Sequence, residues 1–144
     1  MLAFLESVKV TEYYPMFYTA LFTGVRRSEL LALRWSDIDL DLGYISINRS
    51  IHHLEDKSFV FQPPKTAKSR RQVPLSPSTS IVLRQHRDNQ RAAKLLLGNP
   101  VTESSLVFCQ LDGSPLLPRS VSQAWRRLVR QAGFPGIRLH DARH

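Results

Sequence analysis

The apolar residues change their period in the middle of the chain, and this change limits the fold more than any other feature of the sequence. Apolar and polar residues alternate over residues 44–48 and again over 59–61, a spacing typical of strands with one buried face. We expect residues 72–75 to complete a three-stranded antiparallel sheet with them. Pro74 places this last strand at an edge of the sheet or ends it there, because proline has no N–H to donate.

Helical spacing flanks this β region on both sides. Residues 13–22 carry apolar and aromatic side chains at helical intervals before Gly24, and residues 28–33 predict a second, short helix. Further helices are predicted over residues 77–97, after a serine cap and a proline, and over 118–131. The pattern predicts an α+β fold, mainly α-helical with a small three-stranded antiparallel sheet. Its core is expected to include Trp35, Val121, Trp125, Leu128 and Val129.

Charge is distributed unevenly along the 144 residues, which are enough for one domain with a buried core. Residues 1–64 carry 6 Lys and Arg against 8 Asp and Glu, whereas residues 65–144 carry 14 against 4. A basic half is often only a solvated surface. The asymmetry nevertheless favours a polyanionic partner, because clustered cations release counterions from phosphates. Charge alone does not separate DNA from RNA or from an acidic protein.

Targeting signals and disulfides are not indicated by the sequence. Apolar runs are far shorter than a membrane span, and residues 1–9 lack the regions of a signal peptide. The single cysteine, Cys109, allows no internal disulfide and suggests a reducing compartment; we interpret it as a buried structural thiol. We therefore expect no membrane association and a cytoplasmic location.

Three separated stretches carry residues that could act on a phosphate. Arg26 follows a Thr-Gly-Val turn, Lys65 follows two prolines, and His140 and Arg143 lie three residues apart near the last residue. Taken singly, each is more often a surface or structural residue. Two separated arginines with a histidine are, however, what an enzyme needs to hold a phosphodiester and stabilise its transition state.

Together and in this order, these stretches resemble the catalytic domain of the tyrosine recombinases, the phage integrases. The resemblance covers nearly the whole chain and is carried by residues 23–39 (TGVRRSELLALRWSDID), 64–75 (PKTAKSRRQVPL) and 139–144 (LHDARH). It implies the fold of that catalytic domain, incomplete at its C-terminus. Residues 1–144 would then be a partial catalytic domain, without the family's N-terminal DNA-binding domain and C-terminal nucleophile segment.

The resemblance implies site-specific DNA recombination or integration by strand cleavage and rejoining. A tyrosine attacks a phosphodiester and leaves a 3′-phosphotyrosine, and no metal, ATP or other cofactor is needed. Arg26 and Arg143 would donate to the non-bridging oxygens of the phosphate, where charge develops in the transition state. Lys65 would be the general acid for the leaving 5′-oxygen, and His140 would assist proton transfer.

Rivals and supporting residues follow from the same resemblance. Arg27 is an alternative to Arg26, and Lys68 is an alternative to Lys65. Ala142 stands where the family usually has leucine, which implies smaller packing there. Three residues are expected to support the site rather than react, namely Glu29, Asp141 and His144. Four are expected to bind DNA, namely Lys68, Arg70, Arg71 and Arg126, and Arg119, Arg127 and Arg130 are weaker candidates.

The tyrosine nucleophile is not assigned. The tyrosines, Tyr13, Tyr14, Tyr18 and Tyr44, all precede Lys65, and the first three lie in an aromatic segment that is typical of a core. We therefore expect this chain to bind double-stranded DNA as a monomer without cutting it, whereas the full-length, bacterial or phage-encoded parent would act as a homotetramer on DNA. The alternative is a non-catalytic nucleic-acid-binding module or a degenerate integrase remnant.

Overall fold

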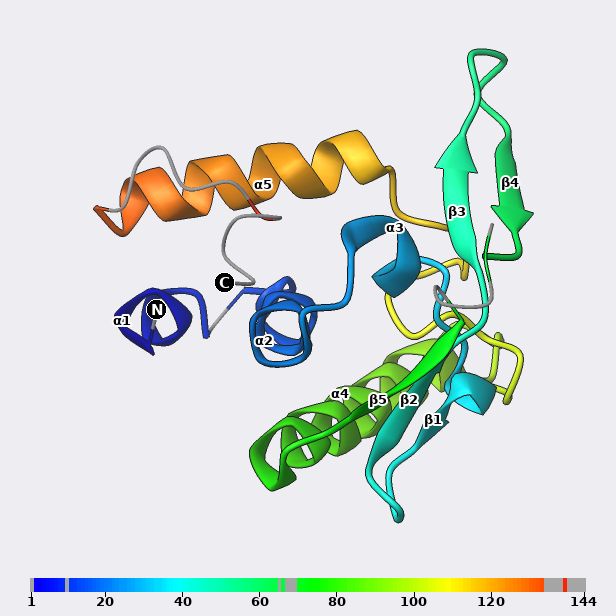
Figure 1. The fold of residues 1–144 in the computed structure, drawn as a ribbon, viewed down its shortest axis with the longest axis horizontal. Helices are drawn as coiled ribbons and strands as arrows, with labels where there is room; N and C mark the ends of the chain where they lie inside the picture. Colours follow the sequence, from blue (N-terminus) through cyan, green and yellow to red (C-terminus); the bar gives the residue numbers. More distant parts are fainter. Residues whose placement is uncertain (1, 10, 65, 67–69, 134–138, 140–144) are drawn as a thin grey trace.

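The computed structural model describes residues 2–9, 11–64, 66, 70–133 and 139. Figure 1 shows most of the helices on one side of the molecule and the strands, with a projecting hairpin, on the other. Among the described residues no helix is both long and apolar enough to cross a membrane. In chain order the elements are α1 (Leu2–Ser7), α2 (Tyr14–Thr23), α3 (Arg27–Leu30), a 3-10 turn η1 (Trp35–Asp37), β1 (Ile38–Asp39), β2 (Tyr44–Ile47), β3 (Ser50–His53), β4 (Phe59–Gln62), β5 (Arg71–Pro74), α4 (Pro77–Leu96) and α5 (Pro118–Gln131).

The α+β fold class is confirmed, and a three-stranded antiparallel sheet is present with the order β1-β2-β5. The register pairs Ile38 with Ile45 and Ile45 with Val73. Strand β5 is an edge strand that ends at Pro74, as predicted. Proline is tolerated at the end of an edge strand because strand pairing does not require an N–H donor at this position.

The membership of the sheet differs from the prediction. Residues 59–62 do not join it; they form β4, which pairs with β3 in a separate two-stranded hairpin through Ile51 and Phe61. The third strand of the sheet is β1, which has only two residues and is too short to show a period in the sequence. Strands β2 and β3 are separated by Asn48 and Arg49. The side chains of both residues donate hydrogen bonds to the carboxylate of Asp37.

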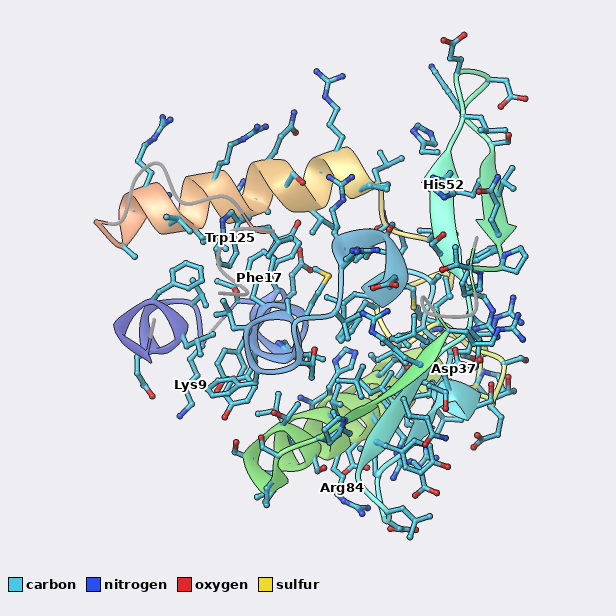
Figure 2. All side chains as sticks on the ribbon, in the orientation of Figure 1. Lys9, Phe17, Asp37, His52, Arg84 and Trp125 are labelled. Carbon is cyan, nitrogen blue, oxygen red and sulfur yellow. The ribbon has the colours of Figure 1, made fainter. Side chains whose placement is uncertain are left out.

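Aromatic packing joins the helices that lie away from the β region. Phe17 on α2 meets Trp125 on α5 edge to face, with ring centroids 5.1 Å apart, and Phe4 on α1 meets the same indole at 4.8 Å. Figure 2 shows Phe17 and Trp125 pointing toward each other between the two helices. All three side chains are buried. Because each buried aromatic ring removes a large apolar area from water, this cluster fixes α5 over α2.

In a second contact region, α4 packs against the segment that connects α3 to β1. Trp35 is buried, as predicted, and its indole N–H donates to Oε1 of Gln90 at 2.7 Å. The backbone N–H of Val107 donates to the carbonyl of Leu33 at 2.9 Å, so residues 105–107 run beside residues 33–35. These contacts leave the start of α3 at the junction of α5, the hairpin and the sheet (Figure 1).

Candidate functional site

Arg26 lies between the end of α2 and the start of α3. Helix α2 ends at Gly24, whose φ of 72° lies in the left-handed region that favours glycine and whose N–H donates to the carbonyl of Ala20. The next residue, Val25, is buried and anchors the turn in the core. Arg26 follows in an extended backbone conformation with an exposed side chain. The turn therefore presents the Arg26 guanidinium at the surface from a rigid base.

Glu29 is the buried carboxylate beneath this turn. Its Oε1 accepts the backbone N–H of Arg26 at 3.0 Å. The same carboxylate forms a bidentate ion pair with the guanidinium of Arg71, with distances of 3.0 and 3.1 Å. A charge-assisted bidentate pair restrains both partners more firmly than a neutral hydrogen bond does. The Glu29 carboxylate therefore restrains the backbone of Arg26, and its supporting role stays a prediction.

The basic residues that follow Lys65 are placed differently from one another. Arg71 was expected to face DNA phosphates, but its guanidinium is held by Glu29 at the start of β5. Its neighbour Arg70 is exposed, and its role as a phosphate contact stays a prediction. Lys68 lies outside the described residues.

A second buried carboxylate, Asp37, organises an arginine that sequence reasoning missed. Its oxygens accept the backbone N–H of Arg34 at 3.0 Å, the side-chain amide of Asn48 at 2.9 Å and the guanidinium of Arg49. Arg49 also donates to the carbonyl of Ala32 at 3.4 Å. Asp37 caps η1, because its side chain accepts the N–H of Arg34, the residue before that turn. Its pairing with Arg49 depends on the bend between β2 and β3.

Arg26 and Arg49 line the same hollow, which we call the basic hollow. Its volume is about 290 Å³, and it opens between α3 and the β3–β4 hairpin. This volume is ample for a phosphodiester group. Gln62, at the end of β4, and the two prolines after it form one wall. The lining comprises Arg26, Ser28, Glu29, Arg49, Ser50, His52, Gln62, Pro63 and Pro64.

His52 is a further residue of the basic hollow that the sequence did not single out. It lies on β3, is exposed, and its Nε2 is 3.2 Å from the hydroxyl oxygen of Ser50. Figure 2 shows His52 on the hairpin beside the body of the molecule. No local motif marks this histidine, because its place beside Arg26 arises from the packing of β3 against α3.

The other predicted catalytic and supporting positions lie outside the described residues. These are Lys65, His140, Asp141, Arg143 and His144. Their roles stay predictions. The structure brings the chain to Pro64, the residue before Lys65, in the wall of the basic hollow.

Arg27, the rival of Arg26, has a different environment. Its Nη1 donates to the hydroxyl of Ser122 at 2.6 Å and to the carbonyl of Pro118 at 3.3 Å, both on α5. Burial lowers the pKa of this guanidinium. Arg27 does not line the basic hollow, whereas Arg26 does. The geometry therefore favours Arg26 as the phosphate ligand.

The solvent face of α5 is strongly basic. Its apolar side is buried, as predicted, through Val121, Trp125, Leu128 and Val129. The opposite face exposes arginines, and the helix contains no acidic residue that would neutralise them. Arg126, a predicted DNA contact, is among them. The exposed arginines of α5 are Arg119, Arg126, Arg127 and Arg130.

None of the tyrosines, all of which are described, lines the basic hollow. Tyr13 and Tyr18 stack on Phe17 and Phe22, two aromatic rings of α2. Burial, with smaller contributions from Tyr18 and Glu6, raises the pKa of Tyr14, which disfavours its phenolate. Tyr44 lines a separate hollow of about 300 Å³ beside β1 and α4.

Comparison with known proteins identifies the family to which this chain belongs. The model of the phage integrase family matches residues 1–144. A tyrosine recombinase XerC-like protein of Caldanaerobacter subterraneus subsp. tengcongensis is 30% identical over 150 residues, which is 96% of this chain and 38% of that protein. The ICEBs1 integrase of Bacillus subtilis is 33% identical over 132 residues, or 91% of this chain and 35% of the relative. The chain therefore spans little more than a third of these relatives.

Solved structures share the fold at lower identity. The Tn1549 transposon integrase, solved in complex with transposon right end DNA, superposes with a TM-score of 0.82 at 20% identity, covering 99% of this chain and 48% of that one. The XerA recombinase gives a TM-score of 0.73 at 19% identity, with 99% and 45% covered. The fold is thus that of the tyrosine-recombinase catalytic domain. With the family match over its whole length, the chain belongs to the phage integrase family.

Proposed function

We propose that this chain is the phosphate-holding part of the catalytic domain of a site-specific DNA recombinase. The observation that carries the proposal is the basic hollow, where Arg26 is exposed, its backbone is fixed by Glu29, and Pro64 forms part of the wall. An arginine held rigidly before substrate arrives can stabilise developing charge without reorganising. Membership of the phage integrase family supports the same reading.

The proposed chemistry is cleavage and rejoining of a DNA strand through a 3′-phosphotyrosine. Arg26 and Arg143 would hold the non-bridging oxygens of the scissile phosphate. Lys65 would give a proton to the leaving 5′-oxygen, and His140 would assist proton transfer. The new phosphotyrosine ester conserves the energy of the broken phosphodiester, so rejoining by a 5′-hydroxyl needs no cofactor. The full-length enzyme would act on double-stranded DNA as a homotetramer.

The nucleophile of this reaction is proposed to be none of the tyrosines in the 144 residues. Tyr14 and Tyr18 belong to α2, Tyr13 is the residue before it, and Tyr44 lines the other hollow. The chain alone should therefore hold a phosphodiester without cleaving it.

A suicide DNA substrate, nicked near the cleavage site, tests the proposal. The full-length gene product should form a covalent protein–DNA adduct, and Arg26→Ala should slow adduct formation at saturating DNA by about 10²–10³-fold if Arg26 is an oxyanion donor. Arg84→Ala is the matched control, because Arg84 pairs with Asp41 away from the basic hollow. An adduct formed by the 144-residue chain itself would refute the assignment of the tyrosines.

A second candidate function is a binding module that grips nucleic acid without chemistry. The exposed arginines of α5 favour it, because they form a basic face that lies on a different element from Arg26. The suicide-substrate experiment separates the two candidate functions. A full-length gene product that binds DNA but gives no adduct with the suicide substrate is a binding module or an integrase remnant.

A further inference from the structure

Arg27 joins two elements that are distant in sequence. It is the first residue of α3, and its guanidinium reaches Ser122 and Pro118 in the first turns of α5, 95 and 91 residues away. In Figure 1, α3 lies directly beneath the end of α5 from which this contact is made. The hydrogen bond to the Ser122 hydroxyl, at 2.6 Å, is short and charge-assisted.

Helix α3 depends on such contacts because it has only four residues. A single helical turn is not stable by itself, since its nucleation cost is not repaid by further hydrogen bonds. Glu29 ties the helix to Arg71 on β5, and Arg27 ties it to α5. Both contacts are made from the single turn of α3, and Arg26 is the residue immediately before it. The backbone at Arg26 is therefore restrained from both β5 and α5.

Helix α5 also carries the exposed arginines Arg119, Arg126, Arg127 and Arg130, whereas Ser122 and Pro118 face α3. We propose that Arg27 is a positioning residue that couples the seating of α5 on DNA to the placement of Arg26 at the scissile phosphate. This inference rests on the proposed recombinase function. Arg27 itself does not touch the phosphate; it acts through the backbone it shares with Arg26.

The test separates DNA affinity from the rate of the chemical step in the full-length gene product. The rate of adduct formation with a suicide substrate at saturating DNA is measured beside the Kd for intact duplex. Arg27→Ala should lower the rate by about 10–100-fold, the loss expected from a small misplacement, while Kd changes less than about threefold. Arg27→Lys should recover part of the rate, because lysine keeps the charge and one donor toward α5.

Ser122 supplies a second variant that removes only a hydroxyl. Ser122→Ala should also lower the rate, and the double variant Arg27→Ala with Ser122→Ala should be no slower than Arg27→Ala, because both changes remove one contact. Ser120→Ala, an exposed serine on the same helix, is the matched control and should keep the wild-type rate. If Arg27→Ala fails to fold, Ser122→Ala decides by the same measurement.

The outcomes that overturn the inference are distinct. A raised Kd with an unchanged rate at saturating DNA would make Arg27 a DNA ligand. Unchanged rate and Kd in both Arg27→Ala and Ser122→Ala would make the contact dispensable. In either case a wild-type adduct leaves the proposed function standing, whereas absence of any wild-type adduct removes the proposed function and this inference with it.

Discussion

Arg71 and Glu29 are 42 residues apart in sequence and share two hydrogen bonds, of 3.0 and 3.1 Å, between guanidinium and carboxylate. The Glu29 side chain is 7% exposed and that of Arg71 34%. Because the same carboxylate accepts the N–H of Arg26, one buried group connects the strand after Lys65 with the base of Arg26. The relative placement of Arg26 and strand β5 thus depends on this buried carboxylate.

Removing the charge of Glu29 should destabilise the fold. Glu29→Gln keeps an acceptor for the N–H of Arg26 but leaves the half-buried guanidinium of Arg71 without its counter-charge, which we expect to cost about 1–3 kcal/mol in free energy of unfolding. Urea denaturation measures this loss. Glu55→Gln, at an exposed carboxylate in the hairpin, should stay within about 0.5 kcal/mol of wild type. Equal stability of the Glu29 and Glu55 variants would contradict the role of the ion pair.

Local signals in the sequence were sufficient for the long elements. The last helix runs from Pro118 to Gln131, as predicted, because proline fixes its first turn and Gly133 with a φ of 87° follows its end. Likewise Pro74 marks the end of an edge strand. Each of these features depends on residues only a few positions apart, so a local sequence pattern is enough to predict it.

Contacts between distant residues could not be predicted from the sequence. The partner of residues 59–62 is β3, and nothing in their alternation distinguishes this pairing from one within the sheet. Arg71 and Arg70 are adjacent basic residues with the same local context, yet only Arg71 meets a buried carboxylate. The place of His52 beside Arg26 depends on the same kind of packing. Of the residues that line the basic hollow, the sequence therefore singled out Arg26 and Glu29 but not Arg49 or His52.

His86 should make stability depend on pH. Burial lowers the pKa of this imidazole, although a hydrogen bond of 2.6 Å to the carbonyl of Val107 opposes the shift. The folded state thus binds a proton less readily than the unfolded state, whose pKa is about 6.5. Stability is full above that value and is lost as pH falls below it, because protons then bind preferentially to the unfolded chain.

The check is the free energy of unfolding at about pH 7.5 and pH 5, which bracket the unfolded pKa. Wild type should lose more stability across this interval than His86→Gln, which has no titrating ring. His53→Gln, at an exposed histidine of the hairpin, should keep the wild-type pH dependence. The same pH dependence in wild type and His86→Gln would exclude His86 as its source.

The exposed arginines of α5 should contribute to DNA binding mainly through phosphates. Arg126→Ala should weaken duplex binding and reduce the slope of log Kd against log salt by about 1, because one fewer counterion is released. Fluorescence anisotropy at several salt concentrations measures both quantities with the 144-residue chain. Arg84→Ala should change neither, since Arg84 lies on α4 and is paired with Asp41. An unchanged slope for Arg126→Ala would place DNA elsewhere on the molecule.

Gly24 should be required for its backbone conformation rather than for space. A Cβ at this position would meet no atom within 4 Å, yet the φ of 72° is strained for residues with a side chain. We expect Gly24→Ala to cost about 1 kcal/mol in free energy of unfolding, measured by urea denaturation. Gly24→Asn should cost less, because asparagine tolerates the left-handed region better than alanine does. The turn positions Arg26, so Gly24→Ala should also slow adduct formation in the full-length gene product more than Gly24→Asn does. Equal losses for the two variants, in stability and in rate, would show that backbone conformation at Gly24 is not the cause.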